Sequence, residues 1–226
     1  MQNIKHYVYL IGKEIKTAFI ENKLLLLFSV LLFFISMFFG YFFAPYISEI
    51  LNPMVDSFRD KIEKGEIRIA PDSIFFNNVY VGIMMYCGAV FFGLFTALIL
   101  VTNGVFIGYF ATQMPLDLFL LYTIPHAIFE IPAIILAGTS GFVLFKFIAG
   151  FVYNIANLKI DDNHEIDKNF DNSDNLSIKD RLVLSLNNNI NKLTQSLSLF
   201  GLSIVLFIVA AFIEAYLTIP IANLFI

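Results

Sequence analysis

Tryptophan is absent from this chain of 226 residues, and cysteine occurs only once. A single cysteine excludes a framework of disulfide bonds within the chain. Charged residues make up only 14% of the sequence, and they gather outside the long apolar runs. The sequence contains no glycine-rich phosphate-binding loop and no basic patch suited to nucleic acid. It therefore argues against a nucleotide-dependent enzyme and against a nucleic-acid-binding protein.

Apolar residues dominate the composition instead. They make up 58% of the chain, with 27 phenylalanines and a mean hydropathy of +0.79. A soluble domain contains about 45–50% apolar residues. We therefore predict an all-α protein, a polytopic transmembrane bundle of about five helical spans with amphipathic surface helices. In this prediction, residues 1–226 form a single membrane domain that lies in the plasma membrane, with the lipid bilayer around it.

Apolar runs and charged segments alternate along the chain. In order, we predict a cytoplasmic amphipathic helix (1–23), a first span (24–44), an extracytoplasmic amphipathic segment (45–76), a second span (77–102), an ambiguous stretch (104–124), a span (125–152), a cytoplasmic loop with a surface helix (153–195) and a last span (196–219). The lysines of the first segment place the N-terminus in the cytoplasm by the positive-inside rule. The ambiguous stretch is either a short third span or a re-entrant half-helix covered by protein or by a wet cavity.

Four residues mark expected breaks in these helices. Asn103 and Gly104 form a turn signal between two apolar runs. Pro125 and Pro132 each remove a backbone donor and loosen a helix one turn upstream. We therefore predict a turn at the first pair and a locally broken helix at the second pair.

Small residues recur at four-residue steps on two of the predicted helices. Their positions are Gly104 and Gly108 on one helix, and Ala133, Ala137 and Gly141 on another. Such faces let another helix come close in a membrane. We predict from them that the protein is a homo-oligomer, although the same faces also suit packing within one chain.

An ionisable pair lies inside a long apolar stretch. His126 and Glu130 are one helical turn apart, so their side chains share a face. Ionisable groups at membrane depth cost about 2.5–3.5 kcal/mol each on insertion scales, so they usually face protein or water. Glu214 falls at a similar depth in the last predicted span, and we predict that the three residues form one intramembrane polar cluster. Such a cluster either joins two helices or binds a ligand, a proton or an ion.

The sequence argues against an enzyme. His126 and Glu130 do not form the His-Glu-x-x-His pattern, and His6 and His164 fall in predicted surface segments. A zinc site with three ligands is therefore poorly supplied, and we expect neither a metal nor a cofactor. Ser140 sits in a Gly-Thr-Ser-Gly sequence like that of intramembrane serine proteases. His126 lies about four helical turns from Ser140 on the same predicted helix, too far to act as its base.

Three motifs carry a resemblance to a known family. They are Pro125-His126-x-x-x-Glu130-x-Pro132-Ala133, Asn103-Gly104 with Gly108, and Glu214-Ala215-Tyr216 with Pro220. Together they are similar to motifs of the stage II sporulation protein M (SpoIIM) family of integral membrane proteins. Proteins of that kind anchor and localise peptidoglycan-remodelling partners while the forespore is engulfed. The resemblance implies a membrane-assembly role and a sporulation-related or similar context.

Two functions of different classes follow. In the first, the chain is a scaffold or assembly factor for membrane or extracytoplasmic partner proteins in cell-envelope or sporulation-type remodelling. In the second, it is an ion or proton channel or a small-solute transporter, in which His126, Glu130 and Glu214 line a polar path. Histidine titrates between pH 5 and 8, so His126 would gate that path. A scaffold predicts a dry, paired cluster, whereas a channel predicts a hydrated cavity that reaches the cluster from both sides.

Overall fold

The computed structural model describes residues 2–63, 70–157 and 178–225, and these residues form helices and no strand. The helices are α1 (Gln2–Glu21), α2 (Lys23–Phe42), α3 (Ala44–Glu63), α4 (Pro71–Cys87), the 3-10 helix η1 (Gly88–Phe91), α5 (Leu94–Phe110), α6 (Leu116–Asn157), α7 (Ile178–Tyr216) and α8 (Thr218–Ala222). The predicted all-α class is confirmed.

Four helical segments are long and apolar enough to cross a membrane. They are α2, α4 together with η1, α6 and α7. The remaining apolar helix, α5, has 17 residues, which is about 26 Å of helix against a hydrocarbon core of about 30 Å. The five predicted spans therefore correspond to four long helical segments and one shorter helix.

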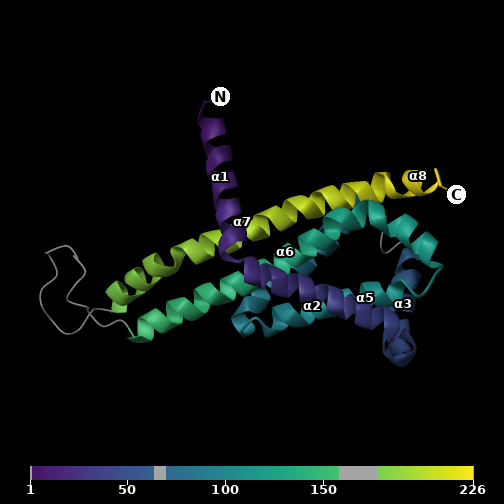
Figure 1. Cartoon of the computed structure of the whole chain (residues 1–226), viewed down its shortest axis with the longest axis horizontal. Helices are drawn as coiled ribbons and strands as arrows, with labels where there is room; N and C mark the ends of the chain where they lie inside the picture. The colour runs from purple at the N-terminus through teal and green to yellow at the C-terminus, as the bar shows by residue number, and fades with distance from the viewer. Residues whose placement is uncertain (1, 64–69, 158–177, 226) are drawn as a thin grey trace, which may run out of the picture.

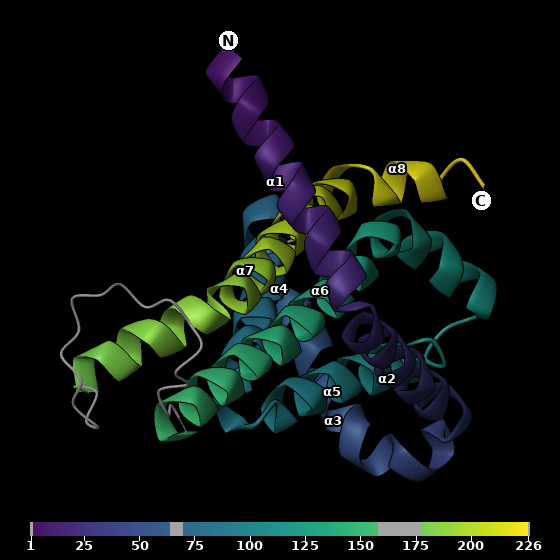
Figure 2. The same cartoon turned by 60° about the vertical axis from the view of Figure 1, so that its left-hand side comes forward.

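The two longest helices, α6 and α7, form an antiparallel pair that runs the length of the molecule (Figure 1). They make the most extensive contact between any two elements, and the next is between α2 and α5. Every residue of α6 from Ala133 to Val143 is buried, so α6 is the central helix. Figure 2 shows α1 leading away from the bundle at a steep angle to α7. This helix leaves the apolar side chains of Tyr9, Ile11 and Ile20 exposed, as an amphipathic surface helix would.

Glycines allow the close packing of α5 on α2. A Cβ atom on Gly104 would overlap the Ser36 hydroxyl, and one on Gly108 would overlap the carbonyl oxygen of Met37. On α6, a Cβ atom on Gly141 would lie 2.6 Å from the carbonyl oxygen of Met85. Both small-residue faces therefore pack against other helices of the same chain. They no longer support the prediction of a homo-oligomer.

The turn predicted at Asn103 and Gly104 is wrong, because both residues lie inside α5. The Asn103 amide donates to the carbonyl oxygen of Ile99 one turn earlier, at 2.8 Å. The chain instead reverses at Phe92 and Gly93, which both have positive φ angles, of 56° and 71°. Asparagine and glycine are common in turns, but here the asparagine bonds back along the helix and the glycine is needed for packing.

The predicted boundaries around this turn are also wrong. The second span begins at the start of α4, inside the segment predicted as 45–76, and it ends with η1 instead of at residue 102. Residues 104–124 do not form a single helix. They are divided between the end of α5, a short connection at 111–115 and the start of α6.

Neither Pro125 nor Pro132 breaks α6, which remains helical through both residues. The helix begins at Leu116, before the predicted start of its span at residue 125. Figure 1 shows it bending near its N-terminal end, the part of the helix that contains these prolines. Proline removes one hydrogen bond from a helix, and a gentle bend accommodates the ring without ending the helix.

The predicted surface helix within 153–195 and the last span are one continuous helix, α7. The predicted loop lies mainly at residues 158–177, outside the described residues. The amphipathic segment before α4 forms α3, which packs on the protein's own helices through Val55 and Ala44. The Tyr109 hydroxyl of α5 donates a hydrogen bond to the Asn52 side chain of α3.

The packing of α5 on α2 predicts unequal effects of two glycine substitutions. We expect Gly108→Ala to lower the free energy of unfolding by about 1–3 kcal/mol, because the added methyl group overlaps the backbone of α2. Gly201→Ala is the matched control, because a Cβ atom at that helical position meets nothing within 4 Å. It should be neutral or stabilising by up to about 1 kcal/mol. Thermal unfolding followed by circular dichroism in one detergent would measure both, and equal stabilities would contradict this packing.

Candidate functional site

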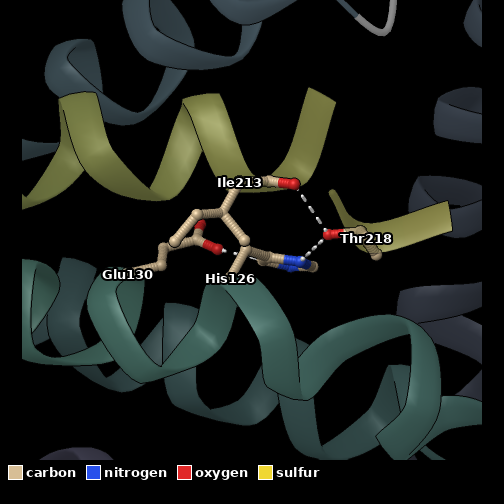
Figure 3. A network of polar contacts seen from close by, with 4 residues as sticks. All are labelled: His126, Glu130, Ile213 and Thr218. Carbon is tan, nitrogen blue, oxygen red and sulfur yellow. Dashed lines mark hydrogen bonds and ion pairs between the residues drawn. The ribbon is translucent and has the colours of Figure 1, made fainter. Parts of the chain in front are cut away.

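The candidate site lies where α6, α7 and α8 meet. His126 and Glu130 project from one face of α6, and Glu214 lies near the end of α7. The chain then turns at Leu217, and α8 begins with Thr218. Figure 3 shows His126 and Glu130 pointing from α6 toward α7, with Thr218 next to the imidazole ring.

The three ionisable side chains predicted to meet do lie together. One nitrogen of His126 and one carboxylate oxygen each from Glu130 and Glu214 are all within 4.8 Å of one another. The Nε2 atom of His126 lies 3.7 Å from a carboxylate oxygen of Glu130. That distance is too long for a direct hydrogen bond. The three side chains therefore meet at a common space, and His126 and Glu130 do not form a direct hydrogen bond across it.

Thr218 fixes the orientation of the His126 ring. The Thr218 hydroxyl donates its single hydrogen to the carbonyl oxygen of Ile213, at 3.2 Å. Its oxygen also lies 3.3 Å from Nδ1 of His126. When the hydroxyl hydrogen is used in this way, the Thr218 oxygen is available to accept from the tautomer of His126 that carries its hydrogen on Nδ1. In the neutral ring, Nε2 then carries its lone pair toward Glu130.

The site is largely enclosed. The side chains of His126 and Glu130 are 13% and 21% exposed. The Asn78 side chain of α4 lies next to the Glu130 carboxylate, which brings a further helix to the site. Among the described residues, no lysine or arginine forms an ion pair with Glu130 or Glu214. Within the described part of the chain, two carboxylates thus lie close together without an ion pair to a lysine or an arginine.

Sequence reasoning missed Thr218 and Asn78. Thr218 is four residues after Glu214, but its contact depends on the turn at Leu217, which no local motif marked. Asn78 was interpreted as the polar start of a span, whereas it lies within α4. An asparagine inside an apolar helix is itself a signal, because a buried amide needs a hydrogen-bond partner.

The other predicted residues have packing roles. Ala133, Ala137 and Gly141 are buried in the centre of the bundle, away from solvent. Ser140 is fully buried, and its hydroxyl donates to the carbonyl oxygen of Ala137 at 2.7 Å. Its carbonyl oxygen accepts a hydrogen bond of 2.9 Å from the Ser196 hydroxyl of α7.

Two open cavities lie at the end of the bundle that contains α3 and α8. One, of about 480 Å³, is lined by the ends of α2 and α5 and the start of α3. The other, of about 330 Å³, lies between the start of α6 and α8. Neither is lined by His126, Glu130 or Glu214. The cluster therefore does not form part of the wall of either cavity.

The convergence of α6 and α7 predicts a specific cross-link. In a Cys87→Ser background, Glu130→Cys combined with Glu214→Cys should form an intramolecular bridge with a short bifunctional thiol reagent, because the two carboxylates lie within 4.8 Å. Ile128→Cys combined with Glu214→Cys is the control, because Ile128 is 61% exposed and lies on another face of α6. Mass spectrometry of the digested protein would detect the joined peptides. Equal yields from both pairs would contradict the geometry of the site.

Comparisons with known proteins agree with the motifs. The family model described as stage II sporulation protein M matches residues 29–219. The uncharacterized protein MJ0706 of Methanocaldococcus jannaschii is 28% identical over 221 residues, which cover 94% of this chain and 89% of that protein. The uncharacterized protein MJ0793 of the same organism is 29% identical over 206 residues, covering 89% and 97%. No solved structure matches the chain. Because the family match covers most of the sequence, this protein belongs to the stage II sporulation protein M family.

Proposed function

We propose that this protein is a membrane scaffold, an assembly factor that holds partner proteins of the cell envelope at the membrane. The observation that carries the proposal is a two-helix extension of the bundle, formed by residues 146–157 of α6 and 178–195 of α7. We call this extension the hairpin arm. It lies at the far end of the α6–α7 pair from α8 (Figure 1).

The lengths of the helices favour a position of the arm beyond a bilayer. Helix α7 has 39 residues, which is about 58 Å, and a hydrocarbon core is about 30 Å thick. The Asn22 side chain donates to the Gln195 side chain at 2.8 Å, so Gln195 is level with the start of α2. Residues 196–216 of α7 alone span about 31 Å. Residues 178–195 therefore extend about 27 Å past the start of α2.

Polar contacts hold the two helices of the arm together. The Ser185 hydroxyl donates to the carbonyl oxygen of Phe151 at 2.6 Å. The amide group of Asn189 lies directly against Gly150, where no side chain intervenes. Within α7, the Lys192 amine donates to the Asn189 side chain at 3.1 Å. The face of α7 that touches α6 in the arm is thus formed by small and polar residues.

The apolar side chains of the arm point outward. On α7, they recur one helical turn apart and form what we call the apolar stripe: Ile178, Leu182, Leu186 and Ile190 are all exposed. Exposed apolar surface outside a membrane marks an interaction site. Apolar residues spaced by one turn suit an amphipathic helix of a partner that lies along the stripe. The arm continues the direction of α6 and α7 and so leads away from a bilayer, which favours a protein over lipid as its occupant (Figure 1).

In this proposal the arm lies in the cytoplasm, which the lysines near the N-terminus favour. Helix α1 ends at the level at which the arm leaves the bundle, where the Gln195 amide donates to the Glu21 carboxylate at 2.6 Å. By the positive-inside rule, Lys13, Lys16 and Lys23 favour the cytoplasmic side for this level. The partner of the apolar stripe is then a cytoplasmic protein or the cytoplasmic part of a membrane protein.

A photo-cross-linking residue placed at Ile190 tests the scaffold proposal in native membranes. We expect one discrete adduct with a different protein, identified by mass spectrometry. Leu186→Asp should reduce its yield about tenfold, since a central apolar contact contributes more than about 1 kcal/mol. Asn187→Asp is the matched control, because it adds the same charge at a neighbouring exposed position. Adducts only with lipid or with copies of this chain, or equal loss in both variants, would contradict the proposal.

A transport function remains the second candidate, because it would use the ionisable residues of the α6–α7 cluster. Liposomes that contain the purified protein distinguish the two candidates. If the protein is a scaffold, proton and cation flux should equal that of protein-free liposomes. His126→Ala and Glu130→Gln should then leave flux unchanged. Flux in the wild-type protein that disappears in both variants, with their helical content intact, would establish transport in place of the scaffold function.

A further inference from the structure

We infer that His126, Glu130 and Glu214 form a binding site for a divalent transition-metal ion, for which zinc is the best match. This inference does not depend on the scaffold proposal. The sequence alone predicted no metal site, because it contains no histidine-rich zinc pattern and only one histidine lies in an apolar stretch. The structure adds a carboxylate from a distant helix to the pair on α6.

The ligand set and its spacing fit zinc. Imidazole nitrogen and carboxylate oxygen both bind zinc, at about 2.0–2.2 Å, and sites open to solvent or substrate use three protein ligands. Two ligands on one tetrahedral ion are therefore separated by about 3.3–3.6 Å. The distance of 3.7 Å between Nε2 of His126 and the Glu130 oxygen matches that separation. All three ligand atoms lie within 4.8 Å of one another, so a small movement of the Glu214 side chain completes the set.

The hydrogen bonds around the site supply an independent argument for a cation. In the tautomer with the hydrogen on Nδ1, Thr218 accepts that hydrogen and the lone pair of Nε2 faces the Glu130 carboxylate. A lone pair and two carboxylates that face one another repel unless a proton or a cation lies between them. No lysine or arginine of the described chain forms an ion pair with either carboxylate. A bound dication satisfies all three groups at once.

The surrounding residues have the positions of outer-shell partners. Ligand histidines in metal sites generally donate their second N–H group to a protein oxygen, which fixes the ring and its tautomer. Thr218 provides such an oxygen at 3.3 Å from Nδ1. The side-chain amide of Asn78 lies next to the Glu130 carboxylate. Because the ligands come from α6 and α7 and their partners from α8 and α4, the ion would hold four helices together at this end of the bundle.

Zinc titration of the full chain tests the site. The protein carries Cys87→Ser and a tag without histidine, is stripped with a chelator in detergent, and is titrated with ZnCl₂ by calorimetry. We expect one zinc ion per chain and a rise in melting temperature. His126→Ala, Glu130→Gln and Glu214→Gln should each weaken binding at least about tenfold, and Thr218→Val should weaken it about 10–100-fold.

Two controls separate the site from unspecific binding. His6→Ala and Glu49→Gln remove the same chemical groups outside the cluster and should leave the affinity unchanged. His126→Cys keeps a metal ligand in place, so it should bind Co²⁺ with a thiolate-to-cobalt absorption band that the wild type lacks. This positive signal also shows that the variant is folded. Absence of zinc binding in the wild type, or equal affinity in the three cluster variants, would overturn the inference.

Discussion

The buried segment of α6 from Ala133 to Val143 is the contact on which the other helices depend. Between helices surrounded by lipid, removal of apolar surface from water contributes little, because lipid tails are as apolar as the side chains. Association then depends on close packing and on hydrogen bonds between helices. Gly141 lets the backbone of α4 approach at Met85, and the carbonyl oxygen of Ser140 accepts from Ser196 of α7. Moving α6 would therefore move α4 and α7, and with them the ends of the helices that carry the polar cluster.

The class of the fold and the position of α2 were predictable from local features, but the position of the next turn was not. The first span is one uncharged run followed closely by Pro45, so length and proline together limit it. The turn at Phe92 and Gly93 lies inside a continuous apolar run, and the stronger local signal was at Asn103 and Gly104. Glycine is required at position 104 within the helix because a Cβ atom there would lie 2.6 Å from the carbonyl oxygen of Phe33, on another helix. No pattern of neighbouring residues contains that information.

The polar cluster was likewise predictable where it depends on residues close in the sequence, and less so where it depends on distant residues. The pairing of His126 with Glu130 follows from helical periodicity. Glu214 was placed near them only by its depth in a span, and the structure brings its carboxylate to the same space. Thr218 requires the turn after α7, and Asn78 requires the early start of α4. The residues that orient the ionisable groups were therefore harder to predict than the groups themselves.

The shortness of α5 has a consequence for the lipid around the protein. Its exposed face, which includes Leu94 and Leu98, belongs to a helix about 4 Å shorter than the hydrocarbon core of an average bilayer. Phe91 and Phe92 are exposed just before this helix, where aromatic side chains suit the headgroup region. Hydrophobic mismatch of this kind thins the bilayer next to α5. It does not thin the bilayer next to α2, because that helix has 20 residues. The protein would then create a local, one-sided depression in the membrane, in which thinner lipid or other short helices would gather.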